Sequence, residues 1–192
     1  MTPIPPGTVG VHIAELQVPN WTVRWRAAKI LAVIGEQSAV EPLIAALSDP
    51  DVWVRWEVAH ALGSIGGVRA TEALILAMCD PDSWVRWEAT RALGNIGGTQ
   101  AVEPLLAAVR DREAQVRWEA IRGLGNLRAG CALESLIAAL SDVEERVRWE
   151  AAHALGIIGG QRAVDALTSS LNDSDERVRT EAARALANVV HG

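Results

Sequence analysis

The chain has 192 residues, of which 49% are hydrophobic, and its formal net charge is −6 at pH 7. This acidic balance argues against general binding to nucleic acids or anionic membranes, and no apolar run approaches the roughly 18 residues that span a bilayer. Residues 1–7 contain neither a basic region nor a long apolar core, so we expect no secretion signal and a soluble, cytoplasmic protein.

The aromatic composition is unusual because the chain has eight tryptophans but no tyrosine and no phenylalanine. Such a bias indicates a specific role for tryptophan. The two cysteines, Cys79 and Cys131, are far apart and lack the spacing of a metal or redox motif. We therefore expect them to remain unpaired.

The dipeptide Val-Arg recurs every 31 residues, beginning at Val23, Val54, Val85, Val116, Val147 and Val178. A fixed period of this length is the signature of stacked structural repeats. The sequence predicts an all-α fold, a right-handed superhelix of six two-helix repeats in a single solenoid over residues 1–192. The expected repeats are about 7–35, 36–66, 67–97, 98–128, 129–159 and 160–192, and the first and last act as caps.

The first helix of each repeat is clearest in the second copy. Val40, Leu43, Ile44 and Leu47 are spaced as i, i+3, i+4 and i+7, which predicts an amphipathic helix. Pro42 lacks a backbone N–H, so it must lie in the first turn of that helix. The first repeat departs from this pattern around residues 11–16.

The second helix of the same repeat is predicted to start within Ser48-Asp49-Pro50-Asp51 and to run to about Ile65. Asp49 is a suitable N-cap, and Pro50 suits the first helical position. The following glycine pair, residues 66 and 67, provides a left-handed stop. One position in this helix is always small, which indicates close approach of neighbouring helices; its residues are Ala32, Gly63, Gly94, Gly125, Gly156 and Ala187.

A second stripe on this helix is aromatic and polar. Trp56 is two residues from the apolar Val54, about 200° around the helix, so the tryptophans are out of phase with the core. Over six repeats the stripe has seven basic and five acidic residues, although the whole chain is acidic. The candidate binding residues are Trp25, Trp53, Trp56, Glu57, His60, Trp84, Trp87, Glu88, Arg91, Trp118, Glu119, Arg122, Trp149, Glu150 and His153.

The repeats resemble HEAT repeats, and more closely the short-repeat branch named after phycobilisome lyases. The resemblance rests on Val-Arg, the Ala-Leu-Gly-x-Ile-Gly ending, and an Asp six residues before the Arg, in the pairs Asp49/Arg55, Asp80/Arg86, Asp111/Arg117, Asp142/Arg148 and Asp173/Arg179. It implies that these pairs bond within or between repeats. It also implies that the second helices line a concave face whose contact positions match Val52, Trp53, Trp56, Glu57 and His60. The branch includes bilin lyase subunits, bacterial proteins of unknown function, artificial binding scaffolds and deoxyhypusine hydroxylase, so it implies a fold rather than one function.

Two interpretations of the stripe remain open. In the first, the tryptophans form a binding groove for a protein or peptide partner along the concave face, because Trp dominates interface hot spots. In the second, each Trp seals the next helix and each Glu forms a surface ion pair three residues on, as in Glu57/His60, Glu88/Arg91 and Glu119/Arg122. The extra residues Trp53 and Trp84 favour binding, and self-association through exposed tryptophans is an alternative.

An enzymatic alternative comes from deoxyhypusine hydroxylase, in which a His-Glu pair at this place binds two irons. Trp replaces that His in five copies here, and Trp cannot ligate iron. Glu57-x-x-His60 and Glu150-x-x-His153 resemble a di-iron motif, but three repeats separate them, roughly 30 Å by stacking. We therefore expect no metal site and no catalytic residues.

A further alternative is a bilin lyase or chromophore-handling subunit, in which tryptophans stack on a tetrapyrrole and Arg and His meet its propionates. A HEAT-like DNA glycosylase is disfavoured because the glutamates form a regular ladder rather than one lone acid. The sequence thus favours a protein-binding scaffold without a resident cofactor.

Overall fold

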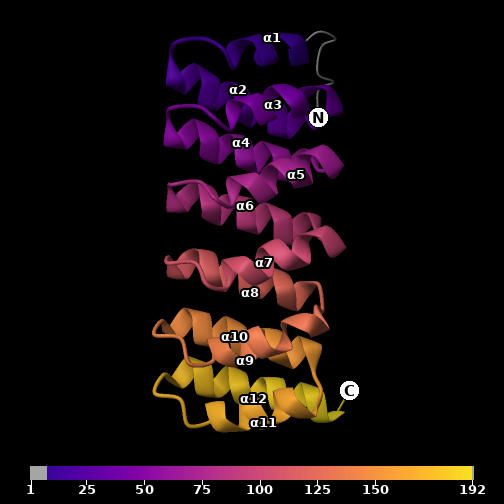
Figure 1. The fold of residues 1–192 in the computed structure, drawn as a ribbon, viewed down its shortest axis with the longest axis vertical. Coiled ribbons are helices and arrows are strands. Elements are labelled where there is room, and N and C mark those ends of the chain that lie inside the picture. The colour runs from indigo at the N-terminus through magenta and orange to yellow at the C-terminus, as the bar shows by residue number, and fades with distance from the viewer. Residues whose placement is uncertain (1–7, 192) are drawn as a thin grey trace. The chain divides into compact units, whose positions relative to one another are not determined.

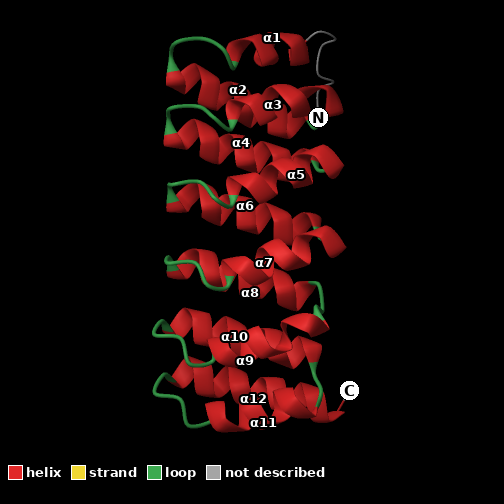
Figure 2. Cartoon of the chain, viewed as in Figure 1, coloured by secondary structure: helices red, strands yellow, loops and turns green. Residues whose placement is uncertain are grey.

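The structure is a computed structural model, and it describes residues 8–191. Every regular element in this range is a helix and none is a strand (Figure 2). The all-α repeat fold expected from the 31-residue period is therefore confirmed. No helix in the described part of the chain is both long and apolar enough to cross a membrane.

The chain divides into two compact units, Met1–Ile96 and Gly97–Gly192, and each contains three of the expected repeats. In the first unit (indigo to magenta in Figure 1), helix pairs pack in chain order, and the second helices also pack on one another. Its elements are α1 (Thr8–Glu15), α2 (Trp21–Ile34), the 3-10 helix η1 (Gln37–Ala39), α3 (Val40–Ala46), α4 (Val52–Ile65), α5 (Val68–Ala77) and α6 (Ser83–Ile96).

The second unit repeats this pattern. Helix α8 packs on α10, and α10 packs on α12, while the shorter helices cover the other side. Its elements are η2 (Thr99–Ala101), α7 (Val102–Ala108), α8 (Ala114–Asn126), η3 (Gly130–Ala132), α9 (Leu133–Ala139), α10 (Glu145–Ile158), α11 (Gln161–Ser170) and α12 (Glu176–His191). In both units, the long second helices form one layer and the first helices form the other.

The start of α4 corrects one local prediction. The N-cap is Asp51, whose carboxylate accepts hydrogen bonds from the backbone N–H groups of Trp53 at 2.9 Å and Val54 at 3.3 Å. Asp49, the predicted cap, instead accepts the backbone N–H of Asp51 at 2.9 Å. The helix therefore begins two residues later than the Asp-Pro-Asp pattern suggested, and Pro50 lies in the preceding turn.

The ends of the second helices follow the glycine prediction. Gly66 and Gly67 have φ angles of 71° and 94°, in the left-handed region that favours glycine. The fourth repeat has Arg128 at the position of Gly66, and Arg128 adopts a φ of 49°. The repeat geometry thus imposes a left-handed residue at this corner even where the sequence supplies a side chain.

The core of each unit is built from leucines at equivalent repeat positions. Leu31, Leu62 and Leu93 on the second helices are fully buried, as are Leu43 and Leu74 on the first helices. The second unit buries the matching set Leu105, Leu124, Leu136, Leu155 and Leu167. These side chains fill the space between the two layers of helices, so the apolar stripes predicted from periodicity are the stripes that pack.

Neighbouring second helices approach closely where the sequence has its invariantly small position. A Cβ atom placed on Gly63 would lie 2.5 Å from the Cβ of Ala92 in α6. In the second unit, a Cβ on Gly125 would lie 2.8 Å from that of Ala154. The close approach predicted from the small residues is confirmed at these contacts.

An arginine–aspartate pair ties each repeat to the next within both units. The guanidinium of Arg55 donates two hydrogen bonds to the Asp80 carboxylate, 25 residues on, at 2.8 and 3.0 Å, and a third to the backbone carbonyl of Asp49 at 2.9 Å. The same paired bonds join Arg24 to Asp49, Arg117 to Asp142 and Arg148 to Asp173. The structural role implied for these residues therefore holds, with the carboxylate bond running between repeats.

Candidate functional site

All eight tryptophans lie on second helices, and they form two groups. The five in the Val-Arg-Trp motif are half-buried and are called the inner tryptophans: Trp25, Trp56, Trp87, Trp118 and Trp149. Trp21, Trp53 and Trp84 lie in the first turn of α2, α4 and α6, are 44%, 47% and 48% exposed, and are called the outer tryptophans. The outer group thus belongs to the first unit only.

Each inner tryptophan is covered by the side chain four residues later, one turn along its helix. The Lys29 ammonium lies 5.0 Å from the Trp25 ring centroid, and the rings of Trp56 and His60 stack 6.0 Å apart with planes 9° apart. The same cover recurs in the pairs Trp87/Arg91, Trp118/Arg122 and Trp149/His153. The inner indoles are therefore held by cation–π and stacking contacts.

Arg146 in α10 reinforces this arrangement. Its guanidinium lies 4.7 Å from the Trp149 ring centroid and 5.4 Å from that of Trp118, in the adjacent helix. It also donates a 2.7 Å hydrogen bond to Glu150. One side chain thus joins two successive inner tryptophans, as the structural interpretation of the stripe requires.

The glutamates of the stripe are buried, which contradicts the expectation of surface ion pairs. Glu57, Glu88, Glu119 and Glu150 are each at most 3% exposed. Ion pairs with arginines offset the cost of burying three of these negative charges. Glu88 pairs with Arg91, Glu119 with Arg122 and Glu150 with Arg146. These carboxylates support the inner tryptophans and are not available to an external ligand.

The histidine partner also differs from the expected one. Nδ1 of His60 lies 3.0 Å from the Glu88 carboxylate of the next repeat and 2.9 Å from the Arg91 guanidinium, and these contacts, not a hydrogen bond to Glu57, fix the ring. The second unit reproduces this cluster with His153, Glu181 and Arg184, where the His153–Glu181 distance is 2.8 Å. The Arg91/Glu88 and Arg122/Glu119 pairs occur as predicted, whereas Glu57/His60 is replaced by a bond between repeats.

Two of these glutamates have a perturbed proton affinity. Burial raises the pKa of Glu57, and nearby His60 and Lys29 and a hydrogen bond from the Trp25 side chain only partly offset it. Burial likewise raises the pKa of Glu150 against the opposing charge of Arg146. Because the Trp25 bond crosses from α2 to α4, this inner tryptophan does seal the neighbouring helix.

The outer tryptophans are placed by helix caps. Asp51 and Asp82 accept the backbone N–H groups of Trp53 and Trp84, each at 2.9 Å, and Asn20 caps α2 immediately before Trp21. In the third repeat the Trp84 ring meets the Trp87 ring edge-on, with centroids 6.2 Å apart. The caps therefore fix the row at the N-terminal ends of three adjacent helices.

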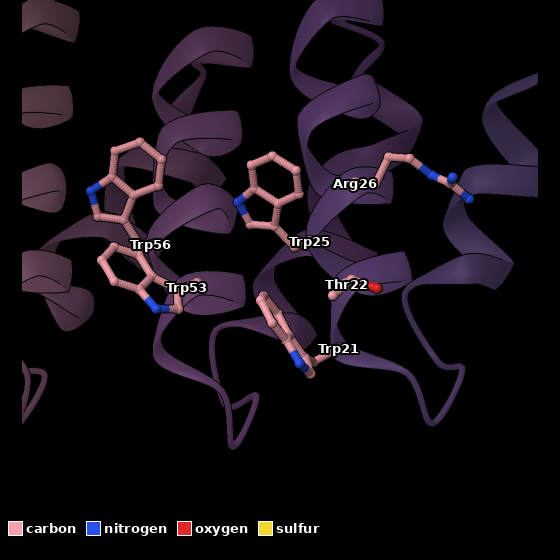
Figure 3. Close-up of a pocket in the computed structure, with 6 residues that line it drawn as sticks. All are labelled: Trp21, Thr22, Trp25, Arg26, Trp53 and Trp56. Atoms are coloured by element: carbon pink, nitrogen blue, oxygen red, sulfur yellow. The ribbon is translucent and has the colours of Figure 1, made fainter.

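An open pocket of about 590 Å³ lies in this row, lined by Trp21, Thr22, Trp25, Arg26, Trp53 and Trp56. Figure 3 shows Trp21 and Trp53 below the inner pair Trp25 and Trp56, nearer to the loops that precede their helices, while Arg26 extends away from the four indoles. The exposed lining is mostly apolar. Such a surface suits a ligand with apolar, rigid groups and few polar contacts.

Trp21 is absent from the predicted set, although it contributes to this pocket. It stands 31 residues before Val52, a position that the family resemblance already marked as a contact position. It also lies one helical turn before Trp25. The 31-residue period and the contact position of Val52 were enough to identify Trp21. Trp21 was missed because it lies one residue before the position that matches Trp53 and Trp84.

Among residues 8–191, no group of three or more His, Cys, Asp or Glu is arranged to hold a metal ion. The predicted site residues all lie on second helices, where the outer and inner tryptophans of the first two repeats meet in one pocket.

A family model described as HEAT repeats matches residues 11–78, 69–117 and 102–187. The chain belongs to the HEAT-repeat family. The matches cover both units and agree with the helix pairs described above. A search of curated proteins found no match.

Solved structures of HEAT-like and armadillo-like proteins share the fold. An engineered protein is 28% identical, with coverage of 95% of this chain and 96% of its own and a TM-score of 0.65. A chain from the complex of CpcE and CpcF of phycocyanin lyase from Nostoc sp. PCC7120 is 25% identical, with coverage of 97% and 78% and a TM-score of 0.71. A designed armadillo repeat protein is 22% identical, with coverage of 95% and 99% and a TM-score of 0.69, a likeness of fold alone.

Proposed function

We propose that this HEAT-repeat protein is a protein-binding scaffold that recognises its partner through the outer tryptophans. The observation that carries the proposal is the row of three half-exposed indoles, Trp21, Trp53 and Trp84, on adjacent helices of one unit. Tryptophan supplies large, rigid contact area and is enriched at interface hot spots.

The residues behind the row prepare it for binding. Inner tryptophans and buried glutamates are already engaged with their neighbours, so little ordering of side chains remains to oppose association. Of the predicted site residues, we assign direct contact to Trp25, Trp53, Trp56 and Trp84, and we add Trp21. Glu57, Glu88 and Arg91 act as supports of this surface.

The relation to known structures favours a protein partner. The chain that is 25% identical to this one comes from a complex of two proteins, CpcE and CpcF of phycocyanin lyase. The 31-residue period and the Ala-Leu-Gly-x-Ile-Gly ending favour the short-repeat branch named after phycobilisome lyases. Both points agree with a scaffold that holds another polypeptide.

The test is a selection of peptides from a random library on the purified protein. We expect peptides that bind the wild type but not the Trp21→Ala/Trp53→Ala/Trp84→Ala variant, with unchanged helicity by circular dichroism because these side chains are half-exposed. The matched control is Leu76→Ala, which removes a 76% exposed apolar side chain elsewhere, on α5, and should bind like the wild type. Failure to find any peptide that depends on the tryptophans would contradict the proposal.

A second candidate is a chromophore-handling subunit, favoured by the likeness to phycocyanin lyase and by the four-indole pocket. Flat indoles can stack on a tetrapyrrole, and Arg26 at the edge of the pocket can meet a propionate. This candidate predicts a shift of the visible absorption of added bilin that Trp53→Ala removes. An unchanged bilin spectrum at saturating protein would exclude it.

A further inference from the structure

The surroundings of Arg146 in the second unit show which group the chain itself places between two successive inner tryptophans. The guanidinium carbon of Arg146 lies 5.4 Å from the ring centroid of Trp118 in α8 and 4.7 Å from that of Trp149 in α10. A guanidinium is planar, permanently charged and weakly hydrated, so it stacks well on the faces of indole rings. Because the Arg146 side chain is half-exposed, this contact forms at the surface of the unit and not in its core.

The first unit has the same two rings but a different residue beside them. Trp25 and Trp56, on the packed helices α2 and α4, stand three 31-residue periods before the two rings that Arg146 joins. Trp53 stands at the repeat position of Arg146 itself. All three of these indoles line the open pocket of about 590 Å³. The first unit therefore has a pocket beside the counterparts of the rings that hold a guanidinium in the second unit.

The basic side chains of α2 do not take the part of Arg146. The Lys29 ammonium covers Trp25 from its own helix, 5.0 Å from the ring centroid, as Arg122 covers its own ring in the second unit. Arg146 is a further cation, which the next helix contributes to the same ring as Arg122. Arg26 lines the pocket, but Figure 3 shows it directed away from the four indoles. The pocket is therefore accessible to a cation that comes from a partner.

Charged groups of both signs border the pocket and the row of outer tryptophans. The half-exposed carboxylates of Asp51 and Asp82 cap the helices that carry two of the three outer tryptophans. The exposed side chains of Arg26 and Lys29 lie on α2, and the Glu57 carboxylate is buried. The accessible charges are equal in number and opposite in sign, so they do not select the charge of a ligand. The indole faces do, because the negative face of each ring attracts a cation.

We propose that this pocket binds an arginine side chain of a partner protein, with its guanidinium held between the rings of Trp25 and Trp56 in the way that Arg146 is held in the second unit. This inference rests on the proposed scaffold function and names the group that the partner presents. Trp21 and Trp53 line the same pocket and supply apolar surface for the aliphatic stem of the incoming side chain.

The test titrates the intact, ¹⁵N-labelled protein with the end-blocked peptide Gly-Ser-Arg-Ser-Gly and with two forms that carry lysine or citrulline in place of the arginine. The indole N–H signals of the eight tryptophans are followed by NMR, each assigned by its replacement with Phe. We expect the arginine peptide to shift the signals of Trp25 and Trp56. Citrulline has nearly the same shape without the charge, so its peptide should bind at least about tenfold more weakly. Equal binding of the arginine and citrulline peptides, or no binding of the arginine peptide, would overturn the inference.

Exchange of residues between the two units tests the comparison with Arg146. Trp53→Arg places the chain's own guanidinium beside the two rings and should block the arginine peptide, more completely than Trp53→Ala. The matched control is Leu76→Arg, which adds the same charge at a 76% exposed position on α5 and should leave binding unchanged. Arg146→Ala should allow the arginine peptide to shift the Trp118 and Trp149 signals as well. Unchanged binding in Trp53→Arg, or no new shift in Arg146→Ala, would contradict the assignment.

Two charge variants test the sign of the ligand. Arg26→Gln removes a repulsive neighbour and should tighten binding of the arginine peptide, whereas Asp51→Asn keeps a helix cap and should weaken binding. Effects of the opposite sign would show that the pocket prefers an anion. A dimer that Trp53→Arg disperses in sedimentation experiments would assign the pocket to a second copy of the chain and would also overturn the inference.

The two proposals fail in different ways. If the library selection described above enriches peptides that depend on the tryptophans but have no arginine in common, the scaffold function stands and the arginine inference falls. If it enriches no such peptide and the arginine peptide does not bind, both fall.

Discussion

Trp21 and Trp25 stand one helical turn apart on α2 and line the same pocket, yet they differ in the side chains that hold them. Lys29 covers Trp25, and the Trp25 side chain bonds to Glu57 of the next helix, whereas the Trp21 side chain contacts no such partner in the described residues. The structural interpretation of the stripe thus fits the inner tryptophans, which contact neighbouring side chains. The binding interpretation is proposed for the outer tryptophans, which are about half exposed.

Sequence reasoning identified the face but not this division. Periodicity places Trp56 out of phase with the apolar stripe, and this is sufficient to put it on the second-helix face. Periodicity cannot show that Glu57 is buried, because its burial depends on packing against the neighbouring helix. Trp25 of that helix extends across to the Glu57 carboxylate. Likewise, the bond from His60 to Glu88 spans 28 residues and leaves no local pattern.

Replacement of Glu57 by Gln tests the energetic role of the buried carboxylate. Burial raises the pKa of Glu57, so its contribution to stability is full below the pKa of the unfolded chain and is lost as pH rises through the folded pKa. Gln removes the buried charge and keeps an oxygen for the Trp25 N–H. Urea unfolding should show Glu57→Gln at least as stable as the wild type at pH 7, with the difference vanishing toward pH 4. A less stable variant at pH 7 would show that the charge itself stabilises the fold.

The Arg–Asp pairs have the opposite pH dependence. The hydrogen bond from Arg148 lowers the pKa of Asp173, so the stability from this pair is present above the unfolded pKa and is lost as pH falls through the folded pKa. Asp173→Asn should lower the free energy of unfolding at pH 7 by about 2 kcal/mol. The loss should shrink as the pH falls below about 4.

The control for this variant is Asp165→Asn, which changes an exposed carboxylate on α11 that bonds only Gln161 in the described part of the chain. Chemical denaturation at neutral and acidic pH should detect little change in this control. An equal loss in both variants would contradict a specific role for the Arg148–Asp173 pair.

At the scale of helices, the contact between neighbouring second helices is set by missing side chains. The prediction that the small position allows close approach is confirmed, because Gly63 faces Ala92 with no room for a methyl group. The predicted cap of α4 is wrong by two residues for an equally physical reason. The Asp49 carboxylate accepts two hydrogen bonds from Arg24, which lies 25 residues earlier in the chain. Asp51 therefore caps α4 in its place.

Gly63→Ala tests that contact. The added methyl group would lie 2.5 Å from the Cβ of Ala92 and 3.3 Å from its Cα, so α4 and α6 must move apart. We expect a loss of about 1–3 kcal/mol in the free energy of unfolding, although alanine favours helix formation by about 1 kcal/mol over glycine. Thermal and urea unfolding would measure it.

Two further variants separate packing from helix propensity. Gly10→Ala in α1 meets nothing within 4 Å and should be neutral or stabilising. The double variant Gly63→Ala/Ala92→Gly restores the space and should recover much of the loss. If the double variant is no more stable than Gly63→Ala, the close contact is not the cause.

Across the whole molecule, tryptophan is the only fluorescent side chain, so emission reports the two groups directly. Iodide should quench the outer tryptophans, which are about half exposed, more strongly than the inner ones. Replacing Trp21, Trp53 and Trp84 by Phe should therefore remove much of the quenchable emission and shift the remainder to the blue. Unchanged quenching in this variant would show that the inner tryptophans are the accessible group.

The bonds between repeats also determine how such a chain can change its length. Within each unit, an arginine pairs with an aspartate 25 residues on at each step from one repeat to the next, and one histidine pairs with a glutamate 28 residues on. Internal duplication or deletion of one 31-residue block re-forms every such pair with the next copy, whereas insertion of a fragment of a repeat leaves charges without partners. Unequal recombination within the first unit can therefore lengthen or shorten the row of outer tryptophans by whole repeats while the helices keep their register.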